Sequence, residues 1–111
     1  MKTAALLSFL CLLSFSAIAA DFQCRYLQNL SEVYRNDVIV ADGARDQVIA
    51  DFDEYKFFMT SLPDSKYELQ AMNSIEPSRT YAVSRLADMN SEISLVIWKR
   101  EAIIEVSCIR K

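Results

Sequence analysis

The chain of 111 residues has no histidine and only one glycine, Gly43. Without histidine, Ser-His-Asp and Cys-His nucleophilic systems, HExxH zinc sites and imidazole proton shuttles are excluded. A single glycine likewise excludes a P-loop and a G-x-G-x-x-G nucleotide-binding loop. Catalysis would need a carboxylate pair, a Ser-Lys dyad or a metal bound by oxygen ligands, and no pair of residues has a spacing that singles it out. We therefore predict that the protein is not an enzyme and has neither a catalytic residue nor a cofactor.

The scarcity of glycine also bears on the turns. Tight hairpin turns use positive φ angles that glycine adopts at no steric cost, so we expect type I turns and longer loops instead. The clearest turn signal is Leu-Pro-Asp-Ser-Lys at 62–66, where proline presets one dihedral angle and Asp and Ser can bond nearby backbone groups. Further turn signals divide the chain into short segments, at 42–43, 76–78, 88–91 and 99–101.

The first nineteen residues have the features of a secretory signal. Lys2 precedes an apolar stretch over 4–18, and Ala-Ile-Ala at 17–19 matches a cleavage site. No later apolar run approaches the roughly 20 residues that span a bilayer. We predict a signal peptide over 1–19 and a single exported domain over 20–111, in the periplasm or outside the cell and without a membrane anchor after cleavage.

Cysteine is rare too. Of three cysteines, Cys11 lies in the signal segment, which leaves Cys24 and Cys108 near the two ends of the exported domain. An even number of cysteines in an oxidising compartment predicts one disulfide bond. Closing a loop of about 85 residues stabilises the folded state by about 4 to 5 kcal/mol in the chain-entropy model.

Apolar and polar residues alternate in several short segments, which predicts strands. Residues 67–71 and 80–83 should pair as one hairpin, and 93–98 and 103–109 as another. The nearly continuous apolar run over 93–98 predicts a strand that is covered on both faces. The remaining strand candidates are 22–27 and 38–40.

Residues 44–62 fit two periods. Their apolar residues recur at helical spacing, which Asp42 could cap and Pro63 could end, whereas the period of two around Tyr55 and the aromatic run at 57–58 favour a strand over 54–62. We predict an all-β fold, a small antiparallel barrel or sandwich of six or seven strands whose first and last strands are tied by the disulfide. The alternative is an α+β fold with one helix near residues 44–60.

The charge of the chain is moderate and unevenly distributed. The formal net charge is -3, which works against binding to a nucleic acid. Residues 20–78 carry five basic and eleven acidic residues, and residues 79–111 carry six basic and four acidic. This asymmetry is either an acidic face opposite a mildly basic one, which can steer a charged partner, or a mixed surface after folding.

Two groups of residues are candidates for a site. One is an acidic stretch that is either a calcium site or a solvated face, but it lacks the D-x-[DN]-x-[DN]-G loop, so we predict no metal: Asp42, Asp46, Asp51, Asp53 and Glu54. The other is a possible recognition patch for a protein or glycan, formed by Trp98 with Arg79, Arg85 and Arg100. It requires Trp98 to point outward, which follows if Ile93, Leu95 and Ile97 point inward. A tryptophan in the core is the competing interpretation.

These features favour a small exported, non-enzymatic binding or structural module of unknown ligand. The alternative is a secreted protein inhibitor of an extracellular hydrolase, a lysozyme or a protease, because a rigid loop binds with little ordering cost. A cysteine near each end, Ser-Arg-Thr-Tyr at 78–81 and Trp-Lys at 98–99 resemble the periplasmic lysozyme inhibitors at scattered positions. The S-G-x-R-Y motif is absent, so the family is not assigned.

Overall fold

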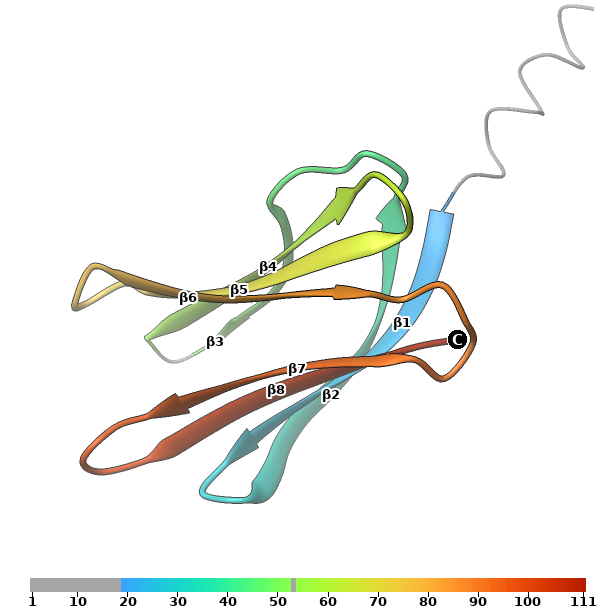
Figure 1. Ribbon diagram of the computed structural model, residues 1–111. Coiled ribbons are helices and arrows are strands. Elements are labelled where there is room, and N and C mark those ends of the chain that lie inside the picture. Colours follow the sequence, from blue (N-terminus) through green and yellow to red (C-terminus); the bar gives the residue numbers. More distant parts are fainter. Residues whose placement is uncertain (1–18, 53) are drawn as a thin grey trace, which may run out of the picture.

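The computed structural model describes residues 19–52 and 54–111, so the predicted signal segment up to residue 18 and Asp53 lie outside the described residues. Eight antiparallel strands form two four-stranded sheets (Figure 1). Sheet A has the order β2-β1-β8-β7 and sheet B the order β3-β4-β5-β6. The strands are β1 (Ala19–Gln28), β2 (Ser31–Ala41), β3 (Gln47–Phe52), β4 (Tyr55–Leu62), β5 (Lys66–Asn73), β6 (Ser78–Arg85), β7 (Glu92–Trp98) and β8 (Ile103–Arg110).

The core lies between the two sheets and follows the alternation of each strand. In β1, Phe22, Cys24 and Tyr26 point inward and are fully buried, whereas the residues between them are partly exposed. Two ring contacts join the layers: Phe22 lies 5.0 Å from Tyr67 and Tyr26 lies 5.2 Å from Phe57, between ring centroids. Burial of these large side chains is the main stabilising contribution of the fold.

The predicted disulfide is confirmed. Cys24 and Cys108 are directly opposite each other in β1 and β8, and their sulfurs are bonded. The bond therefore links the first and last strands at the centre of sheet A, among the buried residues of the core.

The predicted all-β class is confirmed, with eight strands rather than six or seven. The segment at 38–40 is the end of a much longer strand, and residues 47–52 form a strand of their own. The helix proposed near 44–60 is wrong: no helix occurs in the described part of the chain, and hence none that is long and apolar enough to cross a membrane. Tyr55 and Met59 share a face at a spacing of four in a strand as well as in a helix, which explains the ambiguity.

Two finer expectations are wrong. Strand β7 is not covered on both faces, because Ile93 and Leu95 are buried while the residues between them are exposed. The turns do use positive φ angles without glycine, because Asn and Asp tolerate the left-handed region well. Besides Gly43, the residues with positive φ are Asn29, Leu30, Asp46, Asp64, Ser65 and Asn90.

Side-chain amides connect the sheets where β2 and β3 lie side by side. Asn36 of β2 donates to the carbonyl of Ile49 (2.7 Å), and Gln47 of β3 donates to the carbonyl of Ile39 (2.7 Å). Each amide reaches the other strand, so this side of the sandwich is held by two reciprocal hydrogen bonds.

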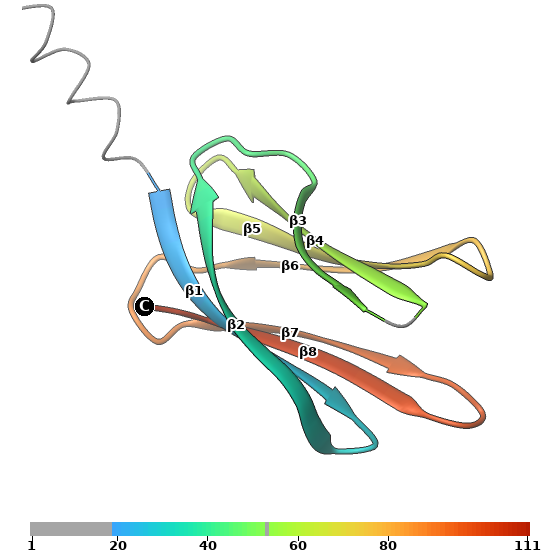
Figure 2. The same cartoon turned by 180° about the vertical axis from the view of Figure 1, so that it is seen from behind.

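The topology places four of the hairpin turns at one end of the sandwich, which we call the hairpin end (Figures 1 and 2). It comprises residues 29–30 between β1 and β2, Glu54 between β3 and β4, 74–77 between β5 and β6, and 99–102 between β7 and β8. The β4–β5 hairpin turn at 63–65 and the two connections that pass between the sheets, β2–β3 and β6–β7, lie at the opposite end.

Candidate functional site

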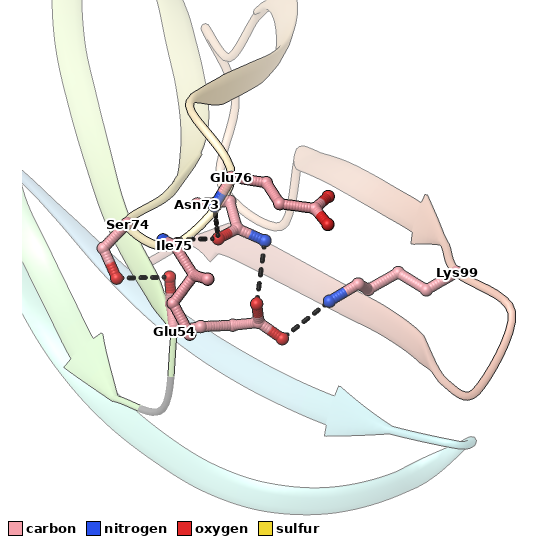
Figure 3. Close-up of polar contacts among 6 residues, drawn as sticks. All are labelled: Glu54, Asn73, Ser74, Ile75, Glu76 and Lys99. Atoms are coloured by element: carbon pink, nitrogen blue, oxygen red, sulfur yellow. Dashed lines mark hydrogen bonds and ion pairs between the residues drawn. The ribbon is translucent and has the colours of Figure 1, made fainter.

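A polar network joins three turns of the hairpin end (Figure 3). Lys99, in the turn after β7, places its Nζ 2.6 Å from Glu54 Oε1, in the turn before β4. The other carboxylate oxygen of Glu54 accepts a hydrogen bond from Asn73 Nδ2 (3.0 Å), at the end of β5. Glu54 thus has both oxygens engaged, one by each sheet.

Asn73 is the central residue of this network. It is buried, and its Oδ1 accepts hydrogen bonds from the backbone amides of Ile75 (2.9 Å) and Glu76 (3.0 Å). Ser74 adds two bonds to the carbonyl of Glu54, from its amide at 2.8 Å and its hydroxyl at 3.0 Å. The β5–β6 turn is therefore fixed internally and attached to the β3–β4 turn.

The electrostatics of the ion pair follow from these bonds. The hydrogen bonds from Lys99 and Asn73 hold the pKa of Glu54 below its ordinary value, and the bond to Glu54 raises the pKa of Lys99. Lys99 Nζ also lies 5.4 Å from the centre of the Tyr55 ring, a cation–π contact. Both groups therefore stay charged at neutral pH and hold the β7–β8 turn in place.

The β1–β2 turn is attached to the start of β8 by two hydrogen bonds. Asn29 donates its amide to the carbonyl of Ile103 (2.9 Å), and its Oδ1 accepts from the amide of Ile103 (3.0 Å). Asn29 and Leu30 both have positive φ, 51° and 70°. This left-handed conformation is costly for leucine, and glycine would adopt it more easily. The turn nevertheless has a large apolar side chain at this position.

Three large apolar side chains project from the hairpin end, two from turns and one from the last residue of β7. Leu30 is 76% exposed, Ile75 is 74% exposed and Trp98 is 77% exposed. Beside Trp98 a hollow of about 390 Å³ separates the β5–β6 and β7–β8 turns. Its lining residues are Glu76, Trp98, Lys99, Arg100 and Glu101.

The structure brings part of the predicted recognition patch together. Trp98 and Arg100 line the same hollow, and the interpretation of Trp98 as a core residue is wrong, since Ile93 and Leu95 point inward. Arg79, second in β6, lines a different hollow and donates to Gln70 Oε1 (3.4 Å). Arg85 is the last residue of that strand and pairs with Asp64 (3.6 Å) at the end opposite the hairpin end.

The described residues of the acidic stretch do not form one cluster. Asp46 accepts hydrogen bonds on sheet B, Asp51 pairs with Lys56 (3.6 Å) and Glu54 pairs with Lys99. Among residues 19–52 and 54–111, no group of three or more acidic or cysteine side chains is placed to hold a metal ion.

Sequence reasoning missed Leu30, Ile75 and the network around Glu54. The one signal for Leu30 was local: Asn-Leu stands at 29–30, between two strands, where a tight turn favours Asn-Gly. Glu54 and Lys99 are 45 residues apart, and no pattern of spacing connects them.

Comparison with family models, with curated proteins and with solved structures gives no match. The site is therefore interpreted from its own geometry.

Proposed function

We propose that the protein is an exported, non-enzymatic binding module that recognises a folded protein partner through its hairpin end. The observation that carries this proposal is the projection of Leu30, Ile75 and Trp98 from the same end of the sandwich. Large exposed apolar side chains gathered on one surface are typical of interaction sites, and tryptophan is enriched among the residues that dominate binding energy.

The polar network supports the same function. It joins the β5–β6 turn, which carries Ile75, to the β7–β8 turn next to Trp98, and the Asn29–Ile103 hydrogen bonds attach the turn that carries Leu30 to β8. The three side chains are therefore presented from backbone that is held in place before a partner arrives. A preorganised surface binds with a smaller loss of conformational entropy than a mobile loop. The charged residues around Trp98 supply the polar rim that such interfaces commonly have.

Export is part of the proposal. It is supported by the signal-like segment over 1–19 and by the buried disulfide, which is compatible with an oxidising compartment such as the periplasm or the extracellular space.

The test uses the purified oxidised protein as bait in periplasmic and secreted fractions, followed by affinity measurement with the captured protein. Trp98→Ala should weaken binding at least tenfold, as expected for a central aromatic anchor. The matched control is Met89→Ala, because Met89 is equally exposed but lies in the β6–β7 connection at the opposite end. Binding that is equal in wild type and Trp98→Ala would overturn the proposal.

A second candidate is inhibition of an extracellular hydrolase. It is favoured by the β7–β8 turn, which presents Trp98 and Arg100 from a backbone held by the Lys99–Glu54 ion pair, as a loop that enters a cleft should be. Residual activity of lysozymes and secreted proteases, measured with increasing amounts of the protein, tests it. Stoichiometric inhibition that is lost in Arg100→Ala supports the candidate, and full activity of every enzyme rules it out for that set.

A further inference from the structure

The outer face of sheet B holds a second polar hollow, of about 360 Å³, which the hairpin end does not use. Its size lies within the roughly 300 to 1,000 Å³ of small-molecule sites. The lining comes from the β2–β3 connection and from β4, β5 and β6: Arg45, Asp46, Thr60, Leu62, Glu68, Gln70 and Arg79.

Two residues of this hollow are buried although they point away from the core. Thr60 follows the core residue Met59 and Gln70 follows the core residue Leu69, so both alternate to the outer face, yet they are only 7% and 6% exposed. Asp46 hydrogen-bonds to both Thr60 and Gln70, and Arg79 hydrogen-bonds to Gln70, so these two charged residues lie over them on the solvent side. A buried polar floor on a solvent-facing sheet is unusual for an ordinary surface.

Gln70 is oriented by three charged neighbours. Its Nε2 donates to Asp46 Oδ1 (3.1 Å) and to Glu68 Oε1 (2.6 Å), and its Oε1 accepts from Arg79 Nη1 (3.4 Å). Thr60 Oγ1 accepts from the amide of Asp46 (2.8 Å) and lies 3.3 Å from Asp46 Oδ1. These hydrogen bonds fix the orientation of Gln70 and Thr60 before a ligand binds, and such preorganisation is what a binding site requires.

The hollow offers a ligand both hydrogen-bond acceptors and hydrogen-bond donors. The bonds that the described residues make to the two carboxylates use Asp46 Oδ1 and Glu68 Oε1, which leaves Oδ2 and Oε2 as acceptors for a ligand. The guanidinium groups of Arg45 and Arg79 supply donors. Two cations and two anions give the hollow no net charge, which favours a neutral ligand over an ion.

An exposed aromatic ring stands beside this hollow. Tyr81 of β6 is directly opposite Gln70 of β5 and is 62% exposed on the outer face. An aromatic ring next to planar carboxylate, amide and guanidinium groups offers an apolar surface for stacking and fixed donors and acceptors for hydroxyl groups.

From this combination we infer that the outer face of sheet B binds a neutral saccharide, with its hydroxyl groups on Asp46, Glu68 and Arg79 and one sugar face against Tyr81. The site is separate from the hairpin end, so it does not depend on the proposed protein partner.

The test is an NMR titration of the oxidised protein with maltotetraose, cellotetraose and tetra-N-acetylchitotetraose, with tetragalacturonate as a charged comparison. At least one neutral oligosaccharide should shift the side-chain amide of Gln70 and the backbone amides near Tyr81 at roughly 10 mM or less. Tyr81→Ala and Glu68→Gln should each weaken binding about tenfold, and Tyr81→Phe should retain it.

Trp98→Ala is the control, because it alters the hairpin end and should leave saccharide affinity unchanged. Tyr81 is exposed, so its substitution leaves the fold intact, and it decides the question even if Glu68→Gln is poorly folded. The inference is overturned if no neutral oligosaccharide shifts these amides, if tetragalacturonate binds better than all of them, or if Tyr81→Ala binds like wild type. It is also overturned if Trp98→Ala alone abolishes the shifts.

Discussion

Lys99 Nζ lies 2.6 Å from Glu54 Oε1, and this ion pair connects a turn of sheet A to a turn of sheet B. The β7–β8 turn and the β3–β4 turn belong to different sheets, so no backbone ladder among the described strands joins them. The Lys99–Glu54 ion pair connects them, and the Asn73 amide attaches Glu54 to the end of β5. The exposed Trp98 precedes Lys99 directly and pairs with Ile103 in the β7–β8 ladder, so the ion pair lies next to the tryptophan.

We expect Glu54→Gln to lower the melting temperature by an amount that depends on pH. The pKa of Glu54 in the folded protein is below its ordinary value of 4.5, so its stabilisation is full above that value and is lost as the pH falls through the lowered pKa. The pKa of Lys99 is raised from 10.5, so its contribution is full below that value and is lost as the pH rises through the raised pKa. The melting temperatures of wild type and variant should differ most between about pH 5 and pH 10, and the difference should disappear as the pH falls through the lowered pKa of Glu54.

The matched control for this ion pair is Asp51→Asn. Asp51 pairs with Lys56 at 3.6 Å on the same hairpin, but both side chains are more exposed than those of Glu54 and Lys99. We expect a smaller change in melting temperature, because exposed pairs contribute little. Equal effects of the two substitutions at every pH would contradict a special role for Glu54.

The disulfide should account for a large share of the stability. Cys24 and Cys108 are separated by 84 residues, and a loop of this length corresponds to about 4.5 kcal/mol in the chain-entropy model. Cys24→Ser should lower the free energy of unfolding by several kcal/mol, measured by urea denaturation, and reduction of the wild type should have a similar effect. Identical unfolding curves of oxidised and reduced protein would contradict this role.

Leu30→Gly should stabilise the folded protein and weaken its affinity for the proposed protein partner at the hairpin end. Leu30 has a φ of 70°, a conformation that costs a non-glycine residue about 1 kcal/mol, and its exposed side chain makes no compensating core contact. The expected gain is about 1 kcal/mol in the free energy of unfolding. If Leu30→Gly is less stable than wild type, the leucine conformation is not strained, and Leu30→Ala then separates loss of the side chain from the change of backbone.

The fluorescence of the protein should report an exposed tryptophan. Trp98 is the only tryptophan in the chain and is 77% exposed, so acrylamide and iodide should both quench the emission strongly in the folded state. Trp98→Ala should change the free energy of unfolding by less than about 0.5 kcal/mol, as substitutions at exposed sites usually do. A blue-shifted emission that iodide does not quench would place the ring in the core.

The strands could be predicted because alternation of apolar and polar residues is a local pattern. The disulfide could be predicted because so few cysteines are available to form it. Alternation at 67–71 and 80–83 identified one hairpin, and only two cysteines remain after residue 20. Residues 44–60 could not be assigned with the same clarity, because a spacing of four places side chains on one face in a helix and in a strand alike. The structure resolves the choice through the burial of Tyr55, Phe57 and Met59, which share the inner face of β4.

Composition and short-range pattern were enough to predict the disulfide, to exclude histidine chemistry and to favour an all-β fold, but the helix alternative at 44–60 was excluded only by the strands of the folded chain. The outward direction of Trp98, and the projection of Leu30, Ile75 and Trp98 from the same end, follow from the way the sheets pack. Glu54 and Lys99, or Asp46 and Gln70, are far apart in the chain and meet because sheet order and register bring their strands together. Long-range pairing is set by the packing of the whole core, so the contacts between these residues leave no signal in the sequence around any one of them.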